Sequence, residues 1–184
     1  MFDELKNTRT LTVMAIFMAL TILTSHFFSI TFIDKSFGLT FIITAVMCSV
    51  LPTKLCIIVA LVSDVIGNLV FPTPGGFYPP FMITKVVTAI IYGKFLYNKK
   101  ITFKNIFIVS TLNALIASMI LNSLWVSQLT GNPYIAQIIA RIPTTITNYV
   151  KDLVIFPLIL DRLVRITRKK LVDIKAIEKP VISG

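Results

Sequence analysis

Residues 54–72, KLCIIVALVSDVIGNLVFP, decide the fold class of this chain. Between Lys54 and Pro72 the only charged side chain is that of Asp64, and about 20 apolar residues of helix suffice to cross a bilayer. Similar apolar runs fill the chain from Leu11 to Leu163. A water-soluble domain could not bury this much apolar length, so the sequence predicts an all-α membrane protein with several spans.

Composition supports this class and limits the chain to one domain. Of the 184 residues, 55% are hydrophobic and 14% are charged, whereas an ordinary globular chain has about 25% charged residues. Six spans would use roughly 120 residues, which leaves room only for short loops. Cys48 and Cys56 are predicted to be free thiols in packed helices, because there is no CxxC motif and only one histidine. Neither a metal site nor a cofactor is expected.

Apolar runs between helix breakers predict six transmembrane helices in a single bundle, followed by a basic tail at 165–184. Turn-rich loops separate the third span from the fourth and the fifth from the sixth. The expected spans are about 9–30, 38–52, 54–72, 80–97, 103–128 and 138–164.

The basic residues predict which side of the membrane each loop faces. Fourteen of the 18 lysines and arginines lie in the gaps on one side or in the two termini, and Lys35 alone lies in the gaps on the other side. Short loops rich in Lys and Arg stay in the cytoplasm. Both termini are therefore expected in the cytoplasm, and the protein is expected in a bacterial cell membrane. The net charge of +10 is explained by this topology, and no nucleic-acid partner is expected.

A second group of polar residues falls inside the spans, where an ionisable side chain costs about 2.5–3.5 kcal/mol. Such groups usually face the interior of a bundle. Most of them are expected in the outer half of the membrane, which favours a pocket loaded from outside. The candidate ligand-binding residues are Asp64, Asn68, Lys85, Asn122, Trp125, Arg141, Asn148 and Lys151, with Phe77 and Tyr78 in the loop before the fourth span.

Each of these residues also has a purely structural interpretation. Asp64 could form an ion pair with Lys85, Trp125 could belong to the interfacial aromatic belt, and Arg141 could extend to the outer headgroups. Lys151 and its neighbour Asp152 could pair with other helices instead of a ligand. The convergence of cations, an Asp–Asn pair and aromatic rings at one depth favours a ligand with a flat hydrogen-bonding ring and carboxylates.

Ala15 and Ala19 form an Ala-x-x-x-Ala pair in the first span. Small residues four apart allow a second helix to approach closely. The pair lies in the inner half of the span, which predicts a protein partner near the cytoplasmic side.

Several motifs together resemble one family. The chain is similar to the substrate-binding S-components of energy-coupling-factor (ECF) vitamin transporters, most closely the folate-specific ones, over nearly its whole length. The resemblance is carried by AIFMA at 15–19, SDVIG at 63–67, FPT at 71–73, FYPPF at 77–81, IYG at 91–93, and LNSLW at 121–125 followed by Gly131 and Arg141.

The resemblance implies a six-helix subunit that binds folate from outside and works with a transmembrane coupling protein and two ABC-type ATPases. It further implies that Asp64 and Asn68 read the pterin edge, and that Trp125 and the Phe77–Tyr78 loop cover the rings. Arg141, with Lys151 or Lys85, would hold the glutamyl carboxylates, and the Ala15–Ala19 face would meet the coupling protein.

Other functions stay open at this point. The closest alternative is an S-component for another water-soluble vitamin, followed by a small carrier not driven by ATP and by a membrane scaffold. The two halves of the chain show no convincing repeat, which disfavours a carrier, and a scaffold leaves the polar cluster unexplained. The chain has no P-loop motif, so ATP hydrolysis would fall to a partner. An enzyme is least expected, because no catalytic grouping is present.

Overall fold

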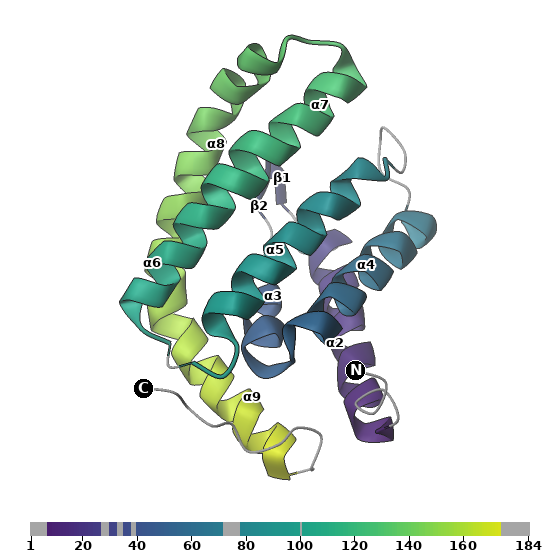
Figure 1. Cartoon of the computed structure of the whole chain (residues 1–184), viewed down its shortest axis with the longest axis vertical. Helices are drawn as coiled ribbons and strands as arrows, with labels where there is room; N and C mark the ends of the chain where they lie inside the picture. The colour runs from purple at the N-terminus through teal and green to yellow at the C-terminus, as the bar shows by residue number, and fades with distance from the viewer. Residues whose placement is uncertain are drawn as a thin grey trace.

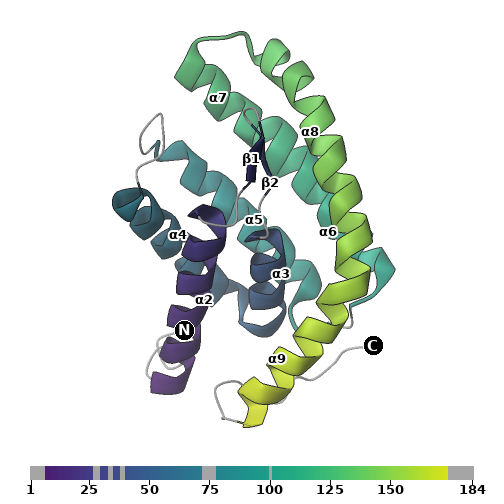
Figure 2. The same ribbon diagram turned by 180° about the vertical axis from the view of Figure 1, so that it is seen from behind.

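The computed structural model describes residues 7–26, 30–32, 35–37, 40–71, 78–99 and 101–173. Its elements are mostly helices, which stand side by side in an elongated bundle (Figures 1 and 2). They are α2 (Thr8–His26), α3 (Thr40–Val50), α4 (Thr53–Val70), α5 (Pro80–Leu96), α6 (Phe103–Leu112), the π-helix η1 (Asn113–Asn122), α7 (Ser123–Thr130), α8 (Tyr134–Ile155), the π-helix η2 (Phe156–Leu160) and α9 (Asp161–Asp173).

Within the described residues, three helical stretches are long and apolar enough to cross a membrane by length and composition: Thr8–Ser25, Thr53–Val70 and Phe103–Thr130. The third combines α6, η1 and α7 in one continuous helical rod. Together with the mostly helical bundle, these stretches agree with the predicted class of helical membrane protein.

Proline and glycine set several helix ends. Pro80 occupies the first turn of α5, where its missing N–H would have no intrahelical acceptor. α7 ends at Gly131, which adopts a left-handed conformation with φ of 72°. A Cβ at Gly93 in α5 would collide with the side chain of Thr53, so glycine is required where α5 crosses the start of α4.

α3 is shorter than the predicted second span, and a β-hairpin precedes it. The eleven residues of α3 extend about 16 Å, roughly half of the hydrocarbon thickness. The strands β1 (Ile30–Phe32) and β2 (Lys35–Phe37) pair antiparallel, with Thr31 opposite Ser36. The hairpin lies in the middle of the bundle in both ribbon views, where the sequence predicted only a connection (Figures 1 and 2).

The apolar core is concentrated in one half of the bundle. We call the half containing the α7–α8 connection the upper half and the half containing α9 the lower half, after their places in Figure 1. Fully buried apolar side chains from α3, α4, α5 and η2 fill the lower half, among them Leu51, Leu55, Tyr92 and Phe156. In the upper half the buried positions are small or polar: Thr24, Ser63, Gly67, Thr84, Ser123 and Thr145. The lower half also buries the polar residues Ser49 and Asp152, so polar groups predominate in the interior of the upper half without being confined to it.

Candidate functional site

The single tryptophan is held on the inner side of the bundle by α5. The indole Nε1 of Trp125 in α7 donates a hydrogen bond to Oγ1 of Thr84, at 3.0 Å. One turn further along α7, the hydroxyl of Tyr78 donates to Oε1 of Gln128 at 3.1 Å. These two bonds join the start of α5 to the end of α7. The Thr84 bond anchors the indole Nε1, and the indole ring is half-buried.

The Asp64–Asn68 pair lies on α4 in the same half of the bundle. The Asn68 amide donates to the backbone carbonyl of Asp64 at 2.8 Å, and both side chains are half-buried. Lys85 is exposed on α5, and among the residues that the structure describes no ion pair joins it to Asp64. The alternative of a structural Asp64–Lys85 pair is therefore not observed. No described side chain forms a hydrogen bond or an ion pair with the Asp64 carboxylate.

Arg141, Thr145 and Asn148 recur along one side of α8. They differ in whether they have protein partners. The buried Thr145 forms a hydrogen bond of 3.0 Å with Ser118 of η1. Asn148 accepts a hydrogen bond from Lys151 at 3.0 Å. In the described part of the chain the half-buried Arg141 has neither an ion pair nor a side-chain hydrogen bond. Its guanidinium is thus the strongest candidate for holding an anionic group of a ligand.

Lys151 is enclosed by protein groups. Its Nζ donates to Asn148, lies 4.0 Å from Oδ1 of Asp152, and stands 4.2 Å from the centre of the Phe41 ring. The Asp152 carboxylate is buried, and its Oδ1 accepts no hydrogen bond from the residues described. The Lys151 ammonium is therefore the nearest described compensation for a buried carboxylate, and it ties α8 to α3.

The π-helix η1 was not foreseen from the sequence, although it carries two of the polar contacts. Asn113 accepts a hydrogen bond from Thr88 of α5 at 3.1 Å, and Ser118 reaches Thr145 of α8. A wider helical turn changes which neighbour each side chain faces, and π-helical turns often occur at functional sites. Asn122 ends this segment and is half-buried.

The structure therefore brings together part of the predicted set. Tyr78 and Trp125 each form a hydrogen bond across the α5–α7 boundary, and Asn148 and Lys151 share a hydrogen bond. Phe77 lies outside the described residues. Sequence reasoning missed Thr84, Gln128 and Phe41. A threonine or glutamine in an amphipathic helix carries no signal of which neighbouring helix it will contact, so nothing in the sequence singled them out.

The predicted partner face is exposed on α2. Ala15 and Ala19 are both exposed in the isolated chain, and they lie beside large exposed side chains at Ile16 and Leu20. This leaves an apolar surface with two small notches that the described residues do not cover.

Comparisons with known proteins give one consistent result. The family described as "ECF transporter, substrate-specific component" matches residues 9–166. The "Folate transporter FolT" of Clostridium novyi (strain NT) is 29% identical over 154 residues, which cover 84% of this chain and 85% of the relative. A solved structure described as "Crystal structure of FolT bound with folic acid" superposes with a TM-score of 0.74 at 25% identity, covering 80% of this chain and 90% of that chain.

Proposed function

Because this chain belongs to the family of ECF transporter substrate-specific components, we propose that it is the folate-binding subunit of such a transporter. We choose folate as the ligand because the chain matches a folate transporter over more than four-fifths of both chains. The structural likeness to a folic acid-bound protein supports it. The chain is a transporter subunit and not an enzyme.

The arrangement of polar groups suits the two chemically different ends of folate. Asp64 and Asn68 offer a carboxylate and an amide for the hydrogen-bonding edge of the pterin ring. Trp125, anchored at Nε1 by Thr84, offers a flat surface for stacking, and Phe77 with Tyr78 would cover the rings. Arg141 would hold one glutamyl carboxylate in a bidentate hydrogen bond. Lys85 or Lys151 would be the second cation, and Asn122 and Asn148 would complete the polar lining.

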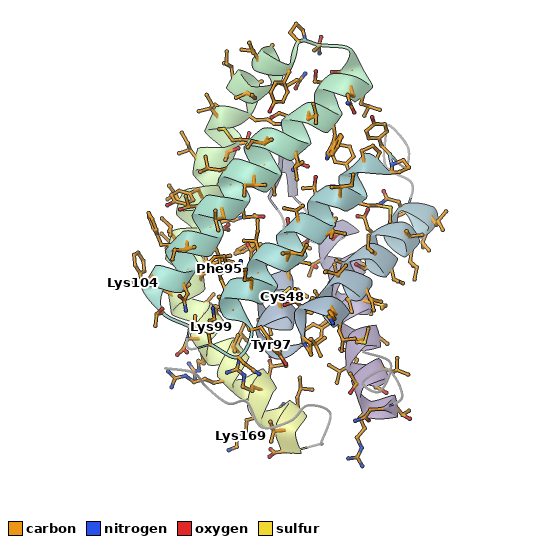
Figure 3. The ribbon with its side chains drawn as sticks, in the orientation of Figure 1. Cys48, Phe95, Tyr97, Lys99, Lys104 and Lys169 are labelled. Atoms are coloured by element: carbon orange, nitrogen blue, oxygen red, sulfur yellow. The ribbon has the colours of Figure 1, made fainter. Side chains whose placement is uncertain are left out.

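The proposed topology has six spans and both termini in the cytoplasm. The spans would be α2, α3, α4, α5, the α6–η1–α7 rod, and α8 with η2. Lys99, Lys104 and Lys169 all lie in the lower half of the bundle in Figure 3. A lower half in the cytoplasm agrees with the preference of basic residues for that side. The upper half, with its polar interior, would then face outward.

Energy for uptake would come from partners. ECF substrate-specific components work with a transmembrane coupling protein and two ATPases. The exposed Ala15–Ala19 face of α2 is the surface that would meet the coupling protein, because small side chains permit close helix packing.

The central test is a binding titration of the purified full chain without nucleotide. Trp125 is the only tryptophan, and it lies in the proposed site, so its fluorescence should change on folate addition and saturate at one folate per chain. Riboflavin, thiamine and pantothenate serve as controls and should give no saturable change. A flat response to folate with a saturable response to one of the others would assign a different vitamin.

Arg141→Ala is expected to weaken folate binding about 10- to 100-fold, because a charge-assisted hydrogen bond contributes about 1.5–3 kcal/mol. Arg141→Lys should recover only part of the loss, since a lysine cannot bind a carboxylate bidentately. The measurement is the fluorescence titration, with thermal unfolding as a check that the variants fold. Equal affinity in the wild type and Arg141→Ala would place Arg141 at the outer headgroups instead.

A further inference from the structure

The helix α9 has one side fixed to the bundle. Val164 and Leu171 are buried, and Nη2 of Arg168 donates a hydrogen bond of 2.8 Å to the carbonyl of Ser49 at the end of α3. A cation at a helix C-terminus also interacts favourably with the helix dipole. α9 is thus a docked part of the fold, and its opposite side points away from the bundle in a defined orientation.

The exposed side of α9 combines basic and apolar residues. Arg162, Arg165 and Lys169 recur at intervals of three and four residues, so they share one edge of the helix, which we call the basic stripe. A second edge, the apolar stripe, consists of Leu163 and Ile166 of α9, which are 36% and 48% exposed, and is continued by Ile159 near the end of η2, which is 43% exposed. Among the described residues, Arg165 is the only member of the basic stripe with an acidic partner: its Nη2 lies 2.8 Å from Oδ2 of Asp161. Such an exposed ion pair contributes little to stability.

The chain turns where α9 begins. Both ribbon views show α9 leaving the line of α8 and crossing the lower end of the bundle (Figures 1 and 2). The turn coincides with η2, which contains Pro157, a residue without the N–H that a continuous α-helix needs. The apolar stripe starts at Ile159, within the last turns of the sixth predicted span. It therefore begins at the depth where the chain leaves the hydrocarbon.

From this geometry we propose that the outer side of α9 binds anionic phospholipids of the cytoplasmic leaflet. The basic stripe would contact their phosphates, and the apolar stripe would lie among the upper acyl carbons, as in other interfacial amphipathic helices. An acidic protein surface would satisfy the basic stripe but would leave the three exposed aliphatic side chains in water. The proposal rests on the membrane topology proposed above and is independent of which vitamin is bound.

The first test measures lipid retention by the purified full chain. The protein in detergent is mixed with equal amounts of phosphatidylglycerol and phosphatidylcholine, and native mass spectrometry counts the lipids that stay bound. The wild type should retain phosphatidylglycerol in preference. Neutralising the stripe with Arg162→Gln, Arg165→Gln and Lys169→Gln should lower this preference at least about tenfold, since each basic residue near an anionic surface changes binding roughly fivefold.

A charge-preserving variant is the matched control. Arg162→Lys, Arg165→Lys and Lys169→Arg keep the charge and should keep the preference. Folate titration of each variant verifies its fold, so a failure of the vitamin assignment is seen separately. Equal retention of both lipids by the wild type, or an undiminished preference in the neutral variant, would overturn the proposal. Unchanged lipid retention in the neutral variant, combined with weaker assembly with the coupling protein and ATPases, would also overturn the proposal. The basic stripe would then be a protein-binding surface.

A second test measures the depth of the apolar stripe. The native cysteines Cys48 and Cys56 are fully buried, so a spin label on Ile166→Cys reports a single exposed site. In vesicles containing phosphatidylglycerol, the label should be more accessible to oxygen than to a water-soluble nickel complex. A label that is mainly accessible to the nickel complex would show that α9 stands in water and would contradict the proposal.

Discussion

Ala15→Trp is expected to abolish folate uptake while leaving folate binding unchanged. Ala15 and Ala19 are exposed on α2, away from Trp125 and Arg141, so a larger side chain there meets no group of the proposed site. An indole ring would fill the notch through which a partner helix is proposed to approach. Uptake of labelled folate by cells carrying the whole transporter measures the first effect, and the fluorescence titration measures the second.

A tryptophan at another apolar position controls for general damage to the membrane domain. Leu115 in η1 is 53% exposed, and η1 lies apart from α2 in both ribbon views (Figures 1 and 2). Leu115→Trp should therefore leave uptake within about twofold of the wild type. Normal uptake by Ala15→Trp would remove this face from the proposed docking surface. Loss of uptake together with loss of binding would indicate a misfolded subunit instead.

The helices could be predicted where composition alone determines them. α4 and α5 begin and end within two residues of their apolar runs at 54–72 and 80–97. Pro80 and Gly131 mark helix ends for reasons contained in one residue: a missing N–H and access to positive φ. Such features depend on local chemistry, so a single sequence is enough to place them.

Features set by packing could not be predicted. The apolar run at 38–52 is short and matches α3 to within two residues at each end, but nothing in the sequence indicated that a hairpin would precede it. In the π-helix η1, Asn113 contacts Thr88 and Ser118 contacts Thr145. The segment contains no proline that would indicate this winding. These outcomes depend on which helices come to lie next to each other, and the sequence of one helix does not contain that information.

The candidate site shows the same division. The types of residue that a folate site needs were identifiable, because charged and amide groups in apolar spans are costly and rare. The sequence did not show which of these side chains are free of protein partners and so able to bind a ligand. From the sequence, both Arg141 and Lys151 were candidates for holding a ligand carboxylate, yet in the structure Lys151 is enclosed by Asn148, Asp152 and Phe41, whereas Arg141 has no such partners among the described residues. Only the packed structure separates the two cations.

This difference leads to a stability prediction for Lys151. Lys151→Met keeps the length of the side chain and its contact with Phe41 but removes the nearest described cation to the buried Asp152 carboxylate. We expect a loss of about 3 kcal/mol in the free energy of unfolding, because a buried charge without its partner is strongly destabilising. Folate affinity should fall less than in Arg141→Ala. Unfolding by sodium dodecyl sulfate titration in mixed micelles measures the stability.

A double-mutant cycle separates the pair from other effects of the substitution. Asp152→Asn removes the charge with little change of shape, so adding it to Lys151→Met should restore most of the lost stability. Lys85→Met is the matched control, because Lys85 is exposed and has no ion pair in the described structure, and it should change stability by no more than about 0.5 kcal/mol. If Lys151→Met leaves stability intact and removes folate binding, Lys151 holds the second carboxylate of the ligand.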